Sequence, residues 1–484
     1  MRIIGNNPAA DNAEITAVAS GTLPDGKPVI VNADGTVSVV SSTTVTESLG
    51  SAVVFESVYI RYVSATYDAN AQKVVIVYFD EGVSDYGRAV VGTVSGTSIS
   101  FGSPTVFESA RADFISATYD ANAQKVVIAY ADGGNSNYGT AIVGTVSGTS
   151  ISFGSAVVFE SANSQYMSAT YDANAQKLVI AYLDGSNSFY GTAIVGTVSG
   201  TSISFGSSAV FESAIVRDIS TTYDASAQKV VIAYWNDPNL DYGTAVVGTV
   251  SGTSISFGTP VVFNSGDTED VSVVYDSNAQ KVVISYGDNG AGRGAAIVGT
   301  VSGTSISFGS PGFFSVQYAL YPVATYDATA KKVVIAFSDY NNSYYGTVIS
   351  GTVSGTSISF DSSTVFKSSS MNDFTLTYDA NAQKVVVAYK DGSNSNYGTG
   401  VVSQTGYVAT NLTSENFIGF TDGAAADTGT AKVQVGCGIN GAQSSLTAGQ
   451  QYFVQTDGTI GTTAADPSVI AGTAISATEI IVKG

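Results

Sequence analysis

Apolar and polar residues alternate in short runs along most of the chain, and the runs are bounded by Gly, Asn, Asp or Ser. Residues 116–162 contain four such runs, all rich in Val, Ile, Thr and Tyr. This pattern is typical of short strands joined by tight turns. No stretch has the spacing of apolar residues that an amphipathic helix requires. The segment therefore predicts four antiparallel strands, called a, b, c and d below.

The four-strand segment recurs seven times. Each copy carries a tyrosine just before the a–b turn, and successive tyrosines are 52 residues apart except for one step of 51. They are Tyr67, Tyr119, Tyr171, Tyr223, Tyr275, Tyr326 and Tyr378. The short step predicts a shortened loop in the fifth copy. Repeated four-stranded units of this length are typical of β-propeller blades, whereas a solenoid has shorter coils and capped ends.

The two ends of the repeat array favour a closed ring. The last copy stops after strand c, near Gly406, without the Ser-Ile-Ser-Phe-Gly strand of the other copies. Residues 45–57 align with residues 149–161 and supply the missing strand from the front of the array. A closed ring leaves no unpaired sheet edge. We therefore expect an all-β chain, with a seven-bladed β-propeller at 45–406 and small β modules at 1–44 and 407–484.

The two flanks share a short motif. Residues 23–37 and 446–460 both read Leu-x-x-Gly, then a run that ends in Val, then Asp-Gly-Thr. Asp-Gly between apolar runs is a strong turn signal, so both segments predict β-hairpins. We expect the flanks to pack together or against neighbouring chains as an attachment module, and the protein to be a homo-oligomer.

Charge and hydropathy exclude several partners. The chain has 19 basic and 39 acidic residues, a net charge of -20 and a pI near 4.1. Nucleic-acid binding depends on Lys and Arg and is not expected. The first residues lack the apolar core of a secretion signal, and no run approaches the roughly 18 apolar residues of a membrane span. We therefore expect neither export directed by this sequence nor a membrane anchor.

The chain contains no histidine, which removes Ser-His and Cys-His nucleophile pairs and the commonest zinc ligand. A single cysteine, Cys437, rules out internal disulfides and is expected to be a small core residue. A glycosidase would need two carboxylates about 5–10 Å apart, which Asp113, Asp218 and Asp270 could supply. The Ser-x-Asp-x-Gly-x-x-Trp boxes of sialidase-like propellers are absent. We expect no enzyme activity and no cofactor.

The seven copies differ from one another mainly in two of their four connections. The a–b and c–d turns are nearly identical in every copy, whereas the d–a and b–c loops vary. In an up-and-down blade these two pairs of connections lie on opposite faces. One face is therefore expected to be uniform and the other diversified. Sequence diversity on one face indicates that this face recognises a ligand. The alternative explanation is sequence drift in loops that packing does not constrain.

The variable d–a loops end in two positions that are expected at the mouth of the central channel. They carry aromatic, carboxylate and guanidinium groups, and the only tryptophan lies in a b–c loop. Aromatic faces stack on sugar rings, while charged and polar groups hydrogen-bond hydroxyls. The candidate ligand-binding residues are Arg61, Tyr62, Asp113, Phe114, Tyr166, Arg217, Asp218, Trp235, Asp270 and Tyr321.

Two loops resemble calcium-binding loops. Asp184 and Asp391 each begin a Gly-Ser-Asn-Ser loop with oxygen-bearing side chains at alternating positions. Both loops lack the later carboxylate that normally completes calcium coordination. A hairpin turn is the preferred interpretation and no metal site is expected, with calcium left as the alternative.

Three segments of the tail, residues 411–420, 446–459 and 471–484, carry a family resemblance, as does the repeat motif at residues 139–154. They resemble virion structural and tail-fibre-like proteins of marine tailed bacteriophages. The resemblance implies an exterior virion protein, assembled in the host cytoplasm, and does not identify which part of the virion it is. Together with the diversified face it predicts a tail fibre or other exterior appendage, which contacts other virion proteins through the flanks and recognises a host-surface glycan or receptor through the variable loops. The alternatives are a structural baseplate, tail or capsid-decoration component without a ligand, and a polysaccharide-degrading glycosidase.

Overall fold

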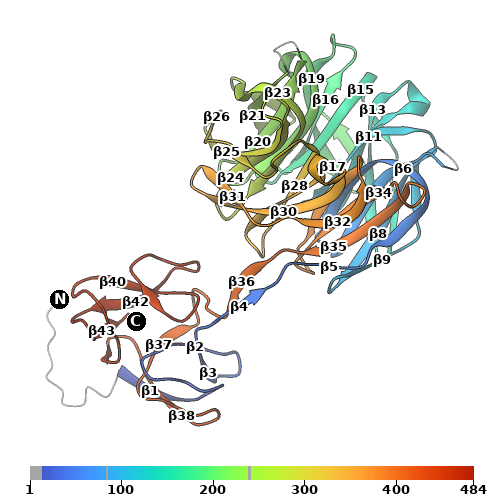
Figure 1. Cartoon of the computed structure of the whole chain (residues 1–484). Coiled ribbons are helices and arrows are strands. Elements are labelled where there is room, and N and C mark those ends of the chain that lie inside the picture. Colours follow the sequence, from blue (N-terminus) through green and yellow to red (C-terminus); the bar gives the residue numbers. More distant parts are fainter. Residues whose placement is uncertain (1–12, 83–84, 238–240, 484) are drawn as a thin grey trace. The chain divides into compact units, whose positions relative to one another are not determined.

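The computed structural model describes residues 13–82, 85–237 and 241–483. Two compact units emerge, one at Glu47–Thr405 and one built from the chain before and after it. Strands dominate both units (Figure 1), and no α-helix occurs in the described ranges. No helix there is long and apolar enough to cross a membrane. The all-β prediction is confirmed.

The repeat unit, Glu47–Thr405, is a series of similar antiparallel sheets. Strand b is β7 (Lys73–Asp80), β12 (Lys125–Asp132), β16 (Lys177–Asp184), β20 (Lys229–Asn236), β24 (Lys281–Asp288), β29 (Lys332–Asp339) and β34 (Lys384–Asp391). Strand c is β8 (Tyr86–Ser95), β13 (Tyr138–Ser147), β17 (Tyr190–Ser199), β21 (Tyr242–Ser251), β25 (Arg293–Ser302), β30 (Tyr345–Ser354) and β35 (Tyr397–Gln404). The fifth b–c connection, between β24 and β25, is the one shortened by a residue.

Strand d is split in two, and its second half continues into strand a of the next repeat. The first halves are β5 (Ser48–Leu49), β9 (Ser98–Phe101), β14 (Ser150–Phe153), β18 (Ser202–Phe205), β22 (Ser254–Phe257), β26 (Ser305–Phe308) and β31 (Ser357–Phe360). The continuations are β6 (Val53–Asp68), β10 (Thr105–Glu108) with β11 (Ala112–Asp120), β15 (Val157–Asp172), β19 (Ala209–Asp224), β23 (Val261–Asp276), β27 (Gly312–Phe313) with β28 (Ala319–Asp327), and β32 (Thr364–Ser370) with β33 (Phe374–Asp379).

One long strand therefore serves two neighbouring repeats. β13 pairs with β14 near one end and with the first half of β15 near the other. The second half of β15 then pairs with β16 of the next repeat. Buried Val, Ile, Ala and Tyr side chains of strands b and c form a core between each repeat and its neighbour. The result is a propeller-like stack in which every repeat is held on both sides.

The repeat tyrosines link consecutive repeats. The hydroxyl of Tyr119 accepts a hydrogen bond of 3.2 Å from Asn70 N–H, in the a–b turn of the preceding repeat. The hydroxyl of Tyr67, in the first repeat, accepts one of 3.1 Å from Asn381 N–H, in the last. β35 of the last repeat also pairs with β5 and β6 from the start of the array. The contact between the last repeat and the first is thus of the same kind as the contact between any repeat and the one that follows it.

A glycine follows the first half of strand d in most repeats. It allows the c–d turn of the next repeat to approach closely. A Cβ atom on Gly154 would lie 1.9 Å from the carbonyl oxygen of Thr201, in the next repeat. The same contact, at 1.8–1.9 Å, occurs at Gly50, Gly102, Gly206, Gly258 and Gly309. The seventh equivalent position holds Asp361, whose carboxylate pairs with Lys332 and accepts from the Ser350 hydroxyl. The repeat that follows Asp361 is the last one, and it has no c–d turn that could clash with a side chain at this position. Asp361 is therefore tolerated where the other repeats have glycine.

The flanking unit contains two five-stranded sheets with the same strand order. The first is β1-β38-β37-β2-β3, and the second is β39-β43-β42-β40-β41. The first sheet consists of β1 (Glu14–Val18), β2 (Pro28–Val31), β3 (Val37–Val39), β37 (Phe417–Thr421) and β38 (Thr430–Gln434). The second consists of β39 (Ile439–Asn440), β40 (Gln451–Val454), β41 (Ile460–Gly461), β42 (Val469–Ala474) and β43 (Ile480–Val482).

The flanking unit is thus one module present twice, and the repeat unit is inserted into the first copy between β3 and β37. The connecting segments pair as a ribbon of β4 (Ser42–Val45) and β36 (Tyr407–Thr410). Cys437 lies in the link between the two modules, in a left-handed conformation, and is exposed. The expectation that it is a core residue is therefore wrong, because the packed faces of the modules lie on their strands and not on this link.

Candidate functional site

A β-bulge shapes the inner end of each d–a connection. In six repeats the strand register shifts there. One residue in each bulge has a left-handed backbone: Tyr62 (53°), Phe114 (50°), Tyr166 (49°), Asp218 (46°), Asp270 (53°) and Tyr321 (54°). Bulges re-aim side chains, and non-glycine residues in this region are strained. Bulky aromatics at three consecutive strained positions are consistent with a functional constraint.

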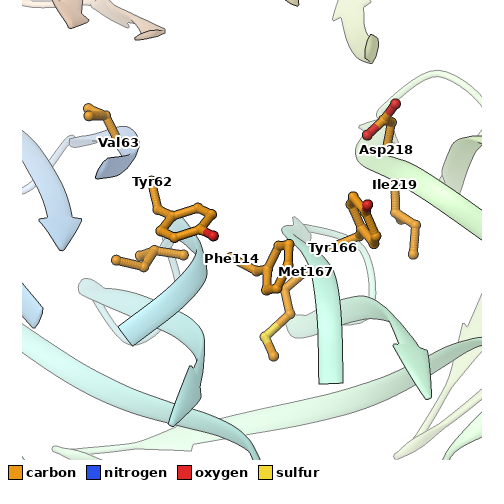
Figure 2. A pocket seen from close by; sticks show the side chains of 8 residues that line it. Tyr62, Val63, Phe114, Tyr166, Met167, Asp218 and Ile219 are labelled. Carbon is orange, nitrogen blue, oxygen red and sulfur yellow. The ribbon is translucent and has the colours of Figure 1, made fainter. Parts of the chain in front are cut away.

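The first three of these side chains form an aromatic arc. The ring centroids of Tyr62 and Phe114 are 5.4 Å apart, and those of Phe114 and Tyr166 are 5.2 Å apart. Figure 2 shows the rings in succession, with Asp218 beyond Tyr166. Together with Val63, Ile115, Met167 and Ile219 these residues line a pocket of about 230 Å³. Pockets for drug-sized ligands are larger, about 300–1,000 Å³. The pocket therefore suits a ligand group of about one ring.

Two arginines border the arc. Arg111 is bound to Asp113 through Nε at 2.7 and 2.8 Å, and it also interacts with the Tyr62 hydroxyl. Burial, followed by the Asp113 carboxylate, raises the pKa of Tyr62 above its ordinary value. At the other end, burial lowers the pKa of Arg217, but its contacts with Tyr166 and Asp237 outweigh this and raise it. The arc thus combines apolar faces with hydroxyl and N–H donors.

All five arginines in the described ranges lie on the variable side, in the d–a connections or at the start of strand c. The repeated lysines instead begin strand b, next to the uniform a–b turns. Guanidinium groups offer a rigid fork of donors and stack on aromatic rings, which an ammonium group does less well. The two faces therefore differ in the chemistry they present as well as in variability.

The acidic members of the same series hold the backbone of the next repeat. The carboxylate of Asp218 accepts from Asp270 N–H at 3.0 Å, and that of Asp270 accepts from Tyr321 N–H at 2.8 Å. Asp373, at the equivalent position of the last repeat, accepts from Tyr62 N–H at 2.9 Å. These groups are partly accessible but crowded by protein atoms, and this desolvation raises the pKa of each. In each of the three carboxylates, at least one oxygen is therefore engaged in holding the backbone of the neighbouring repeat.

Asp270 makes the stability of the repeat unit depend on pH. Burial, followed by the charge of Asp218, raises its pKa to about 7. The folded state therefore holds a proton that the unfolded state releases near pH 4, so stability falls as pH rises from about 4 to 7. The charged groups acting on it are Asp218 and Glu269. Asp270→Asn keeps an acceptor for Tyr321 N–H but cannot ionise.

We expect Asp270→Asn to stabilise the protein by about 2–4 kcal/mol at pH 8 and to have little effect at pH 4. Thermal unfolding of both proteins across this range measures the difference. Parallel pH profiles for the two proteins would contradict the assignment.

The structure brings together four of the sequence-predicted residues in the pocket: Tyr62, Phe114, Tyr166 and Asp218. Asp270 binds the neighbouring backbone, and Tyr321 is exposed beside the acidic side of the series. Arg61 pairs with Glu81 and lies over the Tyr59 ring. Trp235 donates to Asp241 at 2.6 Å, and Arg217 lies over its indole at 5.5 Å.

Sequence reasoning missed Arg111 and the apolar floor of the pocket. Val63, Ile115, Met167 and Ile219 directly follow the bulge residues, at the first inward position of strand a. An apolar residue at that position looks the same in sequence whether it packs in the core or lines a pocket. Arg111 lies two residues before Asp113 in the variable loop, and its distance from the bulge gave no reason to select it. Its side chain folds back toward Asp113, which only the structure reveals.

The two calcium-like loops are closed by their own backbone. Asp184 Oδ1 accepts from both the N–H and the hydroxyl of Ser186. Asp391 does the same with Ser393 and also binds Lys367 Nζ at 2.6 Å. Such contacts are those of Asx turns. Over the described ranges, no group of three or more Cys, Asp and Glu side chains is placed to hold a metal ion.

No family model and no curated protein sequence matches this chain. Solved structures do. The BP39L lectin from Burkholderia pseudomallei aligns with a TM-score of 0.54 and 9% identity, over 73% of this chain and 98% of the lectin. The flanking unit is much shorter than the aligned share, so the alignment covers most of the repeat unit. The repeat unit shares that lectin's fold.

Two further structures align over similar lengths. One is a protein of unknown function from Dyadobacter fermentans, with a TM-score of 0.46, 10% identity, and coverage of 74% of this chain and 99% of the other. The second is the SapL1 lectin in complex with alpha methyl fucoside, with a TM-score of 0.39, 9% identity, and coverage of 64% and 98%. Scores this low add nothing to the fold assignment.

Proposed function

We propose that this protein binds a carbohydrate through the aromatic arc of Tyr62, Phe114 and Tyr166, without catalysis. The observation that carries the proposal is a pocket of about 230 Å³ lined by three consecutive aromatic side chains at strained backbone positions on the diversified face. Aromatic faces recognise the apolar faces of sugar rings, and the bordering hydroxyl, guanidinium and carboxylate groups recognise sugar hydroxyls. The fold shared with a lectin is consistent with such a role.

We further propose that the repeat unit is a closed propeller of seven blades. Seven sequence repeats and the pairing of β5 and β6 with β35 support this. In this arrangement the arc lies on one side of the channel mouth and the acidic residues lie on the other. The ligand site is therefore asymmetric, with one site per ring rather than seven.

The biological setting we propose is the exterior of a bacteriophage virion, as a tail fibre or similar appendage that recognises a glycan of the host surface. The sequence resemblance of the flanks and repeats motivates this proposal. The flanking modules would then attach the protein to other virion proteins, and several copies per particle would offset weak binding at each site.

A glycan array that includes bacterial envelope polysaccharides tests carbohydrate binding. The full chain is compared with a variant carrying Tyr62→Ala, Phe114→Ala and Tyr166→Ala. Tyr321→Ala is the matched control, because it removes a tyrosine from an equivalent bulge outside the pocket. We expect the parent and the control to bind the same glycans and the triple variant to lose them.

Absence of binding by every protein would reject the carbohydrate role and favour a structural component with variable loops. The virion setting is tested separately by mass spectrometry of purified phage particles. Absence of the protein from the particles would reject that setting and leave the carbohydrate result standing.

A further inference from the structure

Each of the two guanidinium groups that border the aromatic arc is already paired with a carboxylate of the protein. Arg111 Nε contacts both carboxylate oxygens of Asp113, at 2.8 and 2.7 Å. At the other end of the arc, Arg217 contacts the Asp237 carboxylate at 3.3 Å. A ligand that carries a carboxylate would therefore meet two ion pairs that are already neutral.

The hydroxyl groups of the arc supply hydrogen-bond donors that carry no charge. The Tyr62 hydroxyl interacts with Arg111, and the Tyr166 hydroxyl interacts with Arg217. A phenol oxygen accepts a hydrogen bond from a guanidinium N–H and keeps its own O–H as a donor. Both tyrosines can therefore donate to a hydroxyl or ring oxygen of a sugar, which a neutral ligand supplies.

Asp218 gives the pocket a negative charge. Of the eight described residues that line the pocket, seven are aromatic or apolar, and Asp218 is the carboxylate among them. Its Oδ2 atom accepts from Asp270 N–H at 3.0 Å. Among the described residues no protein donor reaches its Oδ1 atom, so this oxygen can accept a hydrogen bond from a ligand. Figure 2 shows the carboxylate beyond Tyr166, at the end of the arc.

Two further carboxylates add to the negative charge at this end of the pocket. The charge of Glu269 acts on Asp218, and the charges of Asp218 and Glu269 both act on Asp270. In the described ranges none of these three carboxylates forms an ion pair, and the arginines that border the arc pair with other carboxylates. An anionic group placed here would be repelled. Like charges brought together at a binding site reject the wrong ligand.

We propose that the pocket selects sugar units without a negative charge and rejects hexuronic and sialic acids, and that Asp218 determines this specificity. The inference rests on the proposed carbohydrate binding and adds the class of ligand to it. A neutral sugar would stack on the rings of the arc, accept from the tyrosine hydroxyls and donate a hydroxyl to Asp218 Oδ1. A sugar carboxylate has no proton to donate there and would bring a second negative charge beside the first.

Titration of the full chain with matched glycans at pH 8 tests the selectivity. Each pair consists of a hexose-terminated glycan and its hexuronic acid counterpart, such as glucose with glucuronic acid. The two members differ only in whether the primary alcohol of the terminal sugar is oxidised to a carboxylate. At this pH Asp270, whose pKa is about 7, is also largely ionised. We expect the parent protein to bind the neutral member at least about 10-fold more tightly, and to bind no glycan that ends in sialic acid.

Asp218→Asn keeps an oxygen for Asp270 N–H and removes the charge. It should reduce the preference for the neutral member to less than about threefold. Asp267→Asn is the matched control, because it removes the same charge from an exposed position in the next d–a connection, outside the pocket. Its preference should equal that of the parent. Thermal unfolding checks that both variants are folded.

Equal binding of the two members of a pair by the parent protein would overturn the selectivity and leave carbohydrate binding standing. An unchanged preference in folded Asp218→Asn would overturn the role given to Asp218. Binding of no glycan at all would reject the proposed carbohydrate function, and this inference with it.

Discussion

Phe114→Ala is expected to weaken carbohydrate binding by at least about 30-fold, which corresponds to about 2 kcal/mol. Phe114 is the middle ring of the arc, with centroids 5.4 Å from Tyr62 and 5.2 Å from Tyr166. Its removal takes away one stacking face and also the support that keeps both neighbours in position. Large effects of this kind are typical of aromatic side chains at the centre of a binding site.

Isothermal titration with the best glycan from the array measures this loss. Phe114→Tyr keeps the ring and should bind within a few-fold of the parent protein. Tyr321→Ala should bind like the parent, since Tyr321 lies outside the pocket. Equal affinity of Phe114→Ala and the parent would show that the ligand binds elsewhere on the protein.

Gly154→Ala is expected to destabilise the repeat unit by about 3 kcal/mol or more. The new Cβ would lie 1.9 Å from the Thr201 carbonyl oxygen, and backbone atoms cannot move aside as a flexible side chain can. The c–d turn of the next repeat, which contains Thr201, would have to move away from the end of β14. The methyl group is small, so the cost arises from this displacement and not from any change in hydrophobicity.

Thermal unfolding should detect a fall in Tm of about 5 °C or more for Gly154→Ala. Gly392→Ala is the control, because its Cβ would meet its nearest neighbour at an ordinary 3.6 Å. That variant should unfold within about 1 °C of the parent. An unchanged Tm for Gly154→Ala would mean that the repeats are packed less tightly than the structure describes.

Much of the repeat unit could be predicted from local patterns. The strands follow from alternating apolar residues, the repeat length from the tyrosines, and the pairing of the N-terminal strand from an alignment of residues 45–57 with residues 149–161. The shortened loop of the fifth repeat lies at the β24–β25 connection. These features are predictable because each depends on residues close in sequence, or on comparison of one copy with another.

The candidate site was predictable in part. Comparison of the repeats selected Tyr62, Phe114 and Tyr166, because variability is visible in the sequence. The bulge that re-aims these side chains was not visible, since no glycine marks it. Nor was the role of Asp218 and Asp270, whose carboxylates bind backbone N–H groups of the following repeat. A carboxylate in a variable loop has the same appearance in sequence whether it contacts a ligand or a neighbouring strand.

The sequence by itself determined the strand pattern, the repeat number and the division into a uniform and a variable face. Only the tertiary structure decided that bulge positions 52 residues apart form one aromatic arc, and that the flanks form two copies of one module. In the first of these modules β2 pairs with β37, and Val29 pairs with Gly419, although the whole repeat unit separates the two strands in sequence. Contacts of such separation depend on how complete sheets pack, which no local alternation of apolar and polar residues encodes.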